Sequence, residues 1–133
     1  MSEKLKYLSQ EWAAEALARL KKEIPEEKMN NISTSMTDIY RNCPDGKEHF
    51  LYIQADNGVV TRVEVGTGEP PKAEFTITGD YEVFARISRA EISSQRALMT
   101  GKLRVRGNMA KALKLASVAD RMNKVLSQIP AIY

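Results

Sequence analysis

Hydrophobic residues near the start of the chain recur at helical spacing. Between Trp12 and Ile24 they stand three or four positions apart, and charged residues fill the positions between them. This period is typical of an amphipathic helix with one apolar face. Ser9 is placed to cap its start through the side-chain oxygen, and Pro25 ends it. The polar segment 25–31 then predicts a connection.

The period changes to two after this connection, which predicts strands. Four segments have strand character: 32–40, 50–55, 59–65 and 73–78. A turn containing Pro and Gly at 42–47 separates the first two, and Asp56-Asn57-Gly58 is a hairpin signal between the next two. The first half of the chain therefore predicts one helix followed by an antiparallel meander.

Helical spacing returns after residue 79. Asp80 is placed to cap one short helix, and Ser93 or Ser94 to begin a second, which Gly101 ends. Asn108 is placed to cap a longer C-terminal helix. The second half of the chain is therefore expected to be mainly helical.

A fifth strand, 102–106, interrupts these helices. Leu103 and Val105 alternate in it with basic residues, so one of its faces is apolar. The strand follows a helical crossover, which leaves parallel pairing with an earlier strand open. In the C-terminal helix, Ser117 and Asp120 have the spacing of a capping box, which predicts a break or fresh start there.

The segregation of strands and helices along the chain predicts an α+β fold. We expect a five-stranded, mostly antiparallel sheet covered by helices on one face. The length of 133 residues fits one domain over residues 1–133. A composition of 43% apolar and 28% charged residues is that of an ordinary globular protein, which argues against disorder.

Targeting signals and cysteine content bear on the compartment. No apolar stretch approaches the roughly 18 residues that a membrane-spanning helix needs, and the first residues resemble no secretory signal. The last three residues are not the peroxisomal Ser-Lys-Leu. A single cysteine, Cys43, suits a reducing compartment. We expect a cytoplasmic protein.

Positive charge is concentrated in the second half. Residues 86–124 contain ten Lys or Arg against two acids, a net charge of +8, whereas the rest of the chain carries −5. This asymmetry indicates either an anionic partner or a solvated surface with acids nearby. Proteins that bind single-stranded nucleic acid also interleave aromatic residues with the basic ones. Residues 86–124 contain no aromatic residue, so we expect no nucleic-acid partner.

Residues that would carry bond-making chemistry are scarce. The one histidine, His49, lies at the start of a strand, and Cys43 precedes a proline, so neither has an evident catalytic partner in sequence. No His, Cys and acid cluster of the kind that binds zinc is evident. The glycines at 66 and 68 lead into prolines and not into a helix, unlike a phosphate-binding loop. We expect no catalysis, no cofactor and no metal.

One segment resembles a known family. Residues 101–109, Gly-Lys-Leu-Arg-Val-Arg-Gly-Asn-Met, resemble the Gly-Lys-Leu-Lys-x-x-Gly-Asn-Met signature of the sterol-carrier-protein type 2 family, and Lys114-Leu115 continues it. Gln95 matches a glutamine that precedes the signature. The preceding helix of the family corresponds to Asp80, Phe84 and Ile87. The resemblance extends over roughly residues 75–115.

The resemblance implies a fold and a function. Members of the family have a five-stranded sheet covered by helices, with an apolar tunnel between them. They bind fatty acids, fatty acyl-CoA, sterols or similar lipids, including isoprenoid-like ones, and transfer them between membranes without catalysis. Ala110 replaces a second glycine, which would only tighten the helix start. Leu98-Met99 replaces a bulkier aromatic pair. The shape of the cavity, and with it the ligand, is therefore expected to differ.

Candidate binding residues follow from the predicted facing directions. Four methionines, Met36, Met99, Met109 and Met122, occupy predicted core-facing positions, where this flexible side chain adapts to irregular space. The tunnel lining is expected to comprise Phe75, Ile77, Phe84, Ile87, Leu98, Met99, Leu103, Val105, Met109, Leu113, Met122 and Leu126. Outward-facing Lys102, Arg104 and Arg106 would contact a lipid head group or an anionic membrane surface.

Two other interpretations stay open at this stage. The same fold with a filled core would serve as a structural, dimerising or accessory interaction domain. A small enzyme acting on an acyl thioester is disfavoured by the missing catalytic set. Periodicity alone does not separate a hollow core from a solid one, and it leaves a homodimer open.

Overall fold

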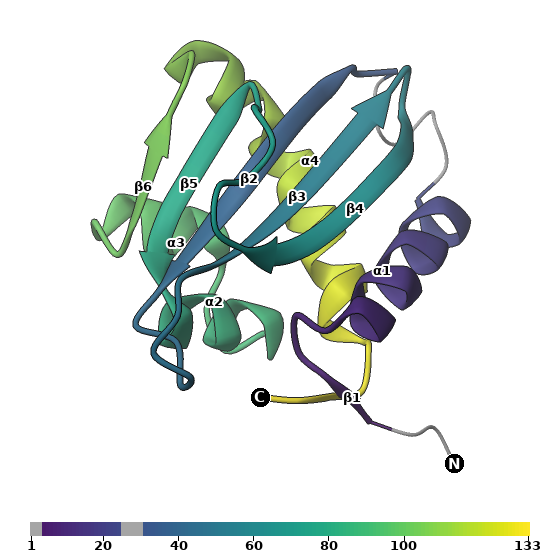
Figure 1. Cartoon of the computed structure of the whole chain (residues 1–133). Coiled ribbons are helices and arrows are strands. Elements are labelled where there is room, and N and C mark those ends of the chain that lie inside the picture. The colour runs from purple at the N-terminus through teal and green to yellow at the C-terminus, as the bar shows by residue number, and fades with distance from the viewer. Residues whose placement is uncertain (1–3, 25–30) are drawn as a thin grey trace.

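A computed structural model describes residues 4–24 and 31–133, with the backbone alone at residues 113, 116 and 117. Figure 1 shows a twisted sheet with helices packed against it. The elements in chain order are β1 (Leu5–Lys6), α1 (Gln10–Glu23), β2 (Thr34–Arg41), β3 (His49–Asp56), β4 (Val59–Thr67), β5 (Phe75–Asp80), α2 (Tyr81–Ser88), α3 (Ser94–Met99), β6 (Leu103–Arg106), α4 (Met109–Ser127) and β7 (Ala131–Ile132). Most of the predicted connection 25–31, including Pro25, lies outside the described residues.

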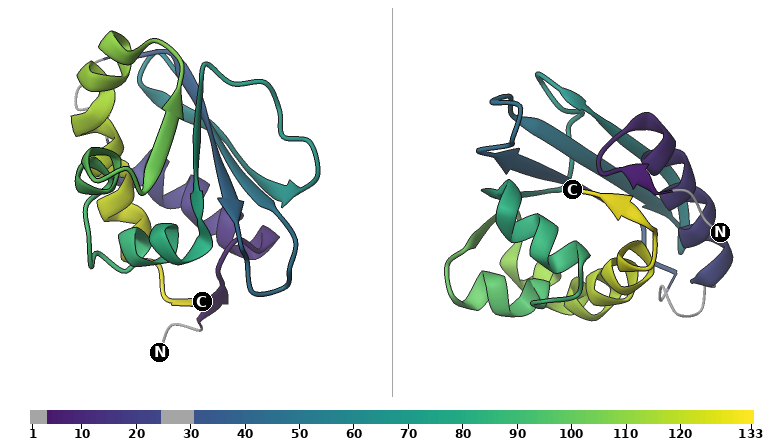
Figure 2. Two further views of the ribbon diagram at one scale, coloured as in Figure 1. Left: turned by 90° about the vertical axis from the view of Figure 1, so that its left-hand side faces the viewer. Right: turned by 90° about the horizontal axis from the view of Figure 1, so that it is seen from below.

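The main sheet has five strands in the order β4-β3-β2-β5-β6. Three of its strand pairs are antiparallel, and β2 pairs with β5 in parallel. The predicted α+β class with a mostly antiparallel five-stranded sheet is therefore confirmed. Helices α2, α3 and α4 cover one face of the sheet, and α1 packs beside β4 (Figures 1 and 2).

One detail of the predicted strand pairing is wrong, and the pairing that was left open for the fifth strand is decided. The fourth predicted strand, β5, does not extend the meander but pairs with β2 in parallel, and β6 pairs with β5 antiparallel. A parallel pair needs a crossover connection, and the segment 68–74 supplies it without a helix by crossing the outer face of the sheet (Figure 2). Thr37 is buried beneath this segment and donates a hydrogen bond to the Pro71 carbonyl at 3.4 Å.

The helices begin at polar residues, as predicted. The Ser9 hydroxyl accepts a hydrogen bond from the backbone N–H three residues later, and the side chains of Ser93 and Asn108 do the same for α3 and α4. Asp80 precedes α2, but its carboxylate accepts from the side chain of Asn42 at 2.9 Å instead of capping. Helix α4 runs without the predicted break, so a capping-box spacing alone did not interrupt it.

Glycine is required where β6 leads into α4. Gly107 has a φ of +133°, and a Cβ there would lie 2.7 Å from a ring carbon of Phe75. A larger residue would therefore force β6 away from β5 or displace the Phe75 ring. Gly101, with a φ of +76°, allows the chain to leave α3 in the left-handed conformation.

The two ends of the chain pair with each other. Strands β1 and β7 form a parallel two-stranded ladder, which brings the N-terminal and C-terminal segments side by side (Figure 2). Each strand has only two residues, too few for an alternation pattern to predict. Among the described residues, no helix combines the length and the apolar character needed to cross a bilayer.

Candidate functional site

A cavity of about 100 Å³ lies between the helix-covered face of the sheet and helices α2, α3 and α4. Its lining is contributed by β2, β3, β5, β6 and these three helices, and most of it is apolar. The lining residues are Met36, Asp38, Ile53, Phe75, Ile77, Phe84, Ile87, Ser94, Gln95, Leu98, Leu103, Val105, Ala112, Leu115, Ala119, Met122, Asn123 and Leu126.

Strand alternation and register position the sheet side of this lining. Asp38 of β2 lies opposite Ile77 of β5, and Ile77 lies opposite Val105 of β6. Residues paired in this way point to the same face of a sheet. The pattern of apolar positions on β5 and β6 therefore predicted the facing of these side chains correctly.

Nine of the twelve predicted tunnel residues line the cavity. They are Phe75, Ile77, Phe84, Ile87, Leu98, Leu103, Val105, Met122 and Leu126. The prediction that Met99 and Met109 face the core is wrong, because these side chains are 81% and 55% exposed. Met99 ends α3 and Met109 begins α4, and a terminal turn is not covered by neighbours on all sides. The side chain of Leu113 lies outside the described residues.

Several lining residues were not predicted as part of the site. Small Ala112 and Ala119 of α4 leave room along the helix, and Ile53 of β3 extends the apolar wall. Asp38 is the unexpected member. It stands two residues from Met36 and so shares its side of β2, which is the one signal in the sequence that could have placed it there.

Asp38 is a carboxylate in a largely apolar wall. It is half-buried and lines the cavity. Burial raises the pKa of its carboxyl from 3.8 to about 7, because the charged form loses hydration. Among the described residues it is the only ionisable group in the lining.

Helix α3 forms the rim of the cavity. Its Leu98 lines the cavity and is also 37% exposed, so this side chain stands between the cavity and solvent. Ser94 at the start of α3 donates a hydrogen bond to Asp120 of α4 at 2.8 Å. The six-residue helix is thus anchored to α4 at its beginning, while its end carries exposed apolar side chains.

The predicted basic contact residues are Lys102, Arg104 and Arg106. All three are exposed, and they alternate with the cavity-lining residues of β6, so they lie on the opposite face of the sheet. They are grouped on an edge strand but do not reach into the cavity. No described acid forms a salt bridge with them.

Other basic residues of the second half are neutralised locally. Arg86 lies 3.6 Å from the carboxylate of Glu91, and Arg89 lies within 3.4 Å of Glu82. Lys111 lies 2.8 Å from Glu74 of the loop before β5. Part of the positive charge therefore has nearby acids, whereas Lys102, Arg104 and Arg106 have no salt bridge to a described acid.

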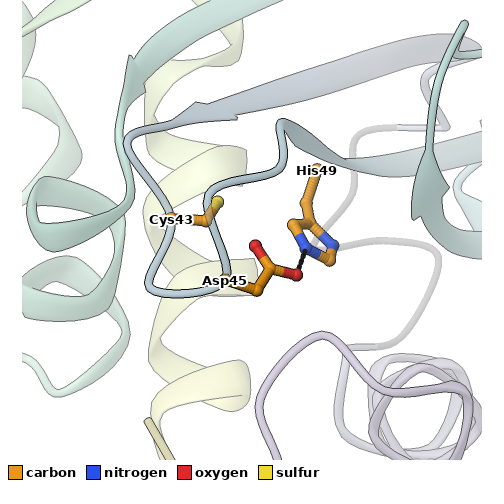
Figure 3. A group of neighbouring side chains, drawn as sticks. All are labelled: Cys43, Asp45 and His49. Atoms are coloured by element: carbon orange, nitrogen blue, oxygen red, sulfur yellow. Dashed lines mark hydrogen bonds and ion pairs between the residues drawn. The ribbon is translucent and has the colours of Figure 1, made fainter.

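A second hollow, of about 420 Å³, lies between the β2–β3 turn and the terminal segments. Cys43, Asp45 and His49 border it, and one ligand atom of each lies within 4.8 Å of the others (Figure 3). The expectation that no metal-ligand cluster exists is therefore wrong for this turn. The short spacing of the three residues was visible in the sequence, but their side-chain directions were not.

Hydrogen bonds already occupy the atoms of this turn. His49 Nε2 lies 2.7 Å from Asp45 Oδ2, and the Lys47 backbone N–H donates to Asp45 Oδ1 at 2.9 Å. Two ligands of one zinc ion stand roughly 3.3 Å apart or more, given metal–ligand bonds of about 2.0–2.3 Å. A metal ion would therefore have to break the Asp45–His49 hydrogen bond.

The thiol of this turn is not activated for nucleophilic chemistry. Burial raises the pKa of Cys43, which disfavours the thiolate, and its Sγ donates to the Tyr40 carbonyl at 3.4 Å. The hydrogen bond from His49 lowers the pKa of Asp45, which is the ordinary effect of a surface pair.

Comparison of the sequence with protein families gives a match over most of the chain. The family described as the SCP-2 sterol transfer family matches residues 3–120. This range contains all five strands of the main sheet, α1 to α3 and the first two-thirds of α4.

Curated relatives share a segment of this chain. Hydroxysteroid dehydrogenase-like protein 2 from Xenopus laevis is 33% identical over 96 residues, which are 69% of this chain and 22% of the relative. The protein of the same name from Bos taurus is 31% identical over 83 residues, 62% of this chain and 19% of the relative. The chain thus spans about a fifth of the length of these relatives.

Solved structures share the fold. A crystal structure of sterol carrier protein 2 has a TM-score of 0.81 at 19% identity, and the match covers 93% of this chain and 99% of that one. A Thermus thermophilus protein described as possibly a sterol carrier protein has a TM-score of 0.80 at 19% identity, covering 98% and 94%. Palmitated sterol carrier protein 2 like 2 from Aedes aegypti has a TM-score of 0.54 at 20% identity, covering 80% and 93%.

Proposed function

Because the chain belongs to the SCP-2 sterol transfer family, we propose that it binds the apolar part of a lipid between the sheet and helices α2, α3 and α4, without catalysing a reaction. The observation that carries this proposal is the cavity itself, since its lining is mostly aliphatic and aromatic. Enclosing each methylene group of a lipid contributes about 0.8 kcal/mol. Enclosing about ten such groups would contribute about 8 kcal/mol before the cost of association is subtracted.

The cavity has to widen to hold a whole lipid chain. Its volume is about 100 Å³, whereas pockets for small molecules usually measure about 300–1,000 Å³. Helix α3 is the element best placed to move, because it has six residues and its Leu98 and Met99 are exposed. Met36 and Met122 in the lining can also change rotamer at low cost.

The ligand classes implied by the family are fatty acids, fatty acyl-CoA and sterol-like or isoprenoid-like lipids. The palmitated Aedes aegypti neighbour supports the general class of long acyl or hydrocarbon ligands. The exposed row Lys102, Arg104 and Arg106 supports a transient contact with an anionic membrane during loading. Binding to anionic vesicles that weakens with added salt would support this contact, and salt-insensitive binding would count against it.

Direct lipid binding tests the proposal. Native mass spectrometry of gently purified protein is expected to show a co-purified lipid, and delipidated protein should bind the neutral dye Nile red. Ala119→Phe places a ring in the cavity and should abolish dye uptake. Met109→Phe adds a ring at an exposed position and is the matched control, which should leave uptake unchanged.

The outcome separates the lipid carrier from the other interpretation of the fold. Absence of both co-purified lipid and dye uptake in the wild-type protein would overturn the carrier function. It would favour a domain with a filled core that serves dimerisation or another accessory interaction. The molecular mass in solution would then show whether the protein dimerises.

A further inference from the structure

Asp38 occupies the middle of the apolar wall of the cavity. It lies on β2, the central strand of the main sheet. On the neighbouring strands its register partners are Leu51 and Ile77, both apolar. Along its own strand Met36 and Tyr40 share its face. A carboxylate at this position interrupts a surface that is otherwise suited to hydrocarbon.

No described side chain neutralises this carboxylate. No salt bridge and no hydrogen bond to Asp38 is formed by the residues that the structure describes. Helices α2, α3 and α4 present apolar or uncharged polar groups across the cavity, such as Phe84, Gln95 and Asn123. The ionisable groups that sense its charge are the phenols of Tyr7 and Tyr40, and these hydrogen-bond to each other at 3.1 Å.

The other acids of the chain near this site are partnered. Glu74 contacts Lys111 and Thr34, and Asp120 accepts from Ser94. The Asp38 carboxylate is half-buried and its oxygens are reached from the cavity. Polar groups that become buried are normally hydrogen-bonded, so a ligand that displaces water from this carboxylate has to supply a partner for it. A hydrocarbon side chain would fit the wall at Asp38 better. A ligand that occupies the cavity beside Asp38 can therefore supply the hydrogen-bond donor that the protein does not.

We propose that Asp38 accepts a hydrogen bond from the hydroxyl group of the bound lipid, so that the cavity selects an uncharged alcohol, long-chain or polycyclic, over a fatty acid. This inference rests on the proposed lipid-binding function and narrows it to one of the implied ligand classes. A hydroxyl donor satisfies the carboxylate and carries its own hydrocarbon into the apolar part of the cavity.

The alternative head groups fit this wall less well. A fatty-acid carboxylate would place a second negative charge beside Asp38, and two carboxylates at close range cannot both stay ionised. A protonated amine would form an ion pair, but both charges would then be removed from water in an apolar pocket, which largely offsets their attraction. An ester or ether has no proton to donate.

Three probes with the same hydrocarbon tail test the proposal. Decan-1-ol, its methyl ether and decanoate are titrated against Nile red bound to the delipidated full chain at pH 8. The wild-type protein should bind the alcohol about tenfold or more tightly than the ether, as expected for a hydrogen bond to a charged acceptor. Decanoate should bind most weakly of the three.

Two variants and a control assign the preference to Asp38. Asp38→Leu should make alcohol and ether equivalent within about twofold and should strengthen decanoate binding, whereas Asp38→Asn should retain part of the alcohol preference. Asp56→Leu changes an exposed aspartate at the end of β3 and should behave as the wild type.

Each outcome decides a different point. Failure of Nile red to bind the wild type overturns the lipid-binding function and this inference with it. Dye binding with equal affinity for alcohol and ether overturns the inference alone, as does an alcohol preference that persists in Asp38→Leu. Tighter binding of decylammonium than of decan-1-ol would also overturn it, since Asp38 would then select a cation.

Discussion

The helix-covered face of the main sheet is filled in two different ways. At one end, rings of Tyr7, Trp12 and Tyr133 pack together, with the Tyr7 ring centroid 5.0 Å from Trp12 and 4.8 Å from Tyr133. Tyr40 and Phe84 continue this cluster, with centroids 4.2 Å apart. At the other end, aliphatic and methionine side chains surround a cavity.

The hydroxyl groups at the aromatic end and the carboxylate at the cavity end also differ in their hydrogen-bond partners. In the aromatic cluster the Tyr7 and Tyr40 hydroxyls share a hydrogen bond, and the Tyr133 hydroxyl donates to Ser88 at 2.8 Å. In the cavity, the Asp38 carboxylate has no described partner. One end of the same face is thus a core of packed rings that joins both chain ends, where among the described residues only the buried Trp12 indole N–H lacks a partner. The other end holds a cavity lined by a carboxylate.

The largest effect is expected from the packed end. Trp12 is 1% exposed, and its indole N–H has no hydrogen-bond partner among the described residues, so its contribution comes from packing. Trp12→Ala should lower the free energy of unfolding by about 3–5 kcal/mol, measured by urea denaturation. A loss below about 1 kcal/mol would show that the aromatic end does not anchor the fold.

The next largest effect is expected in the pH dependence of stability, and it comes from the Asp38 carboxylate at the cavity end. The pKa of Asp38 is raised to about 7 from 3.8, so the folded protein holds the proton more tightly than the unfolded chain. The resulting stability is fully present below about pH 4, decreases as the pH rises to about 7, and then levels off. The total decrease should reach at most about 4 kcal/mol.

Asp38→Asn should remove this decrease, because an amide does not titrate. Asp45 and Glu74 have lowered pKa values, so their contributions are lost as the pH falls through their ordinary values of 3.8 and 4.5, at the acid edge of this window. Both groups are present in the wild type and the variant, so their contributions cancel in the comparison. Urea denaturation of both proteins at pH 4, 5.5 and 8 provides the comparison. Identical pH profiles for the wild type and the variant would refute the assignment to Asp38.

The smallest effect is expected at the rim of the cavity. Leu98→Ala should reduce stability by less than about 1 kcal/mol, since this side chain is 37% exposed. Leu103 also lines the cavity but is 4% exposed, and Leu103→Ala should cost about 2–5 kcal/mol. Leu98→Ala should in addition accelerate dye release in stopped-flow measurements. Equal stability losses in the two variants would contradict the placement of Leu98 at the rim and of Leu103 in the interior.

Local patterns predicted the elements because their causes are local. The alternation in β6 places Leu103 and Val105 on one face, and the caps at Ser9 and Asn108 use hydrogen bonds within one helical turn. The strand order was not predictable in this way. The parallel pairing of β2 with β5 depends on the path of segment 68–74 across the outer face, which no periodicity encodes.

The sequence by itself determined the approximate positions of the five strands of the main sheet and of α1 to α4. It also determined which family the 101–115 segment resembles, and which side of β2 Asp38 shares with Met36. Only the tertiary structure decided that a cavity lies beside α3 and that no basic side chain among the described residues lines it opposite Asp38. It also decided that the side chains of Met99 and Met109 are exposed to solvent. The physical reason is that facing direction follows from the backbone repeat of one strand. Empty space and missing partners depend instead on how the side-chain volumes of several distant elements add up.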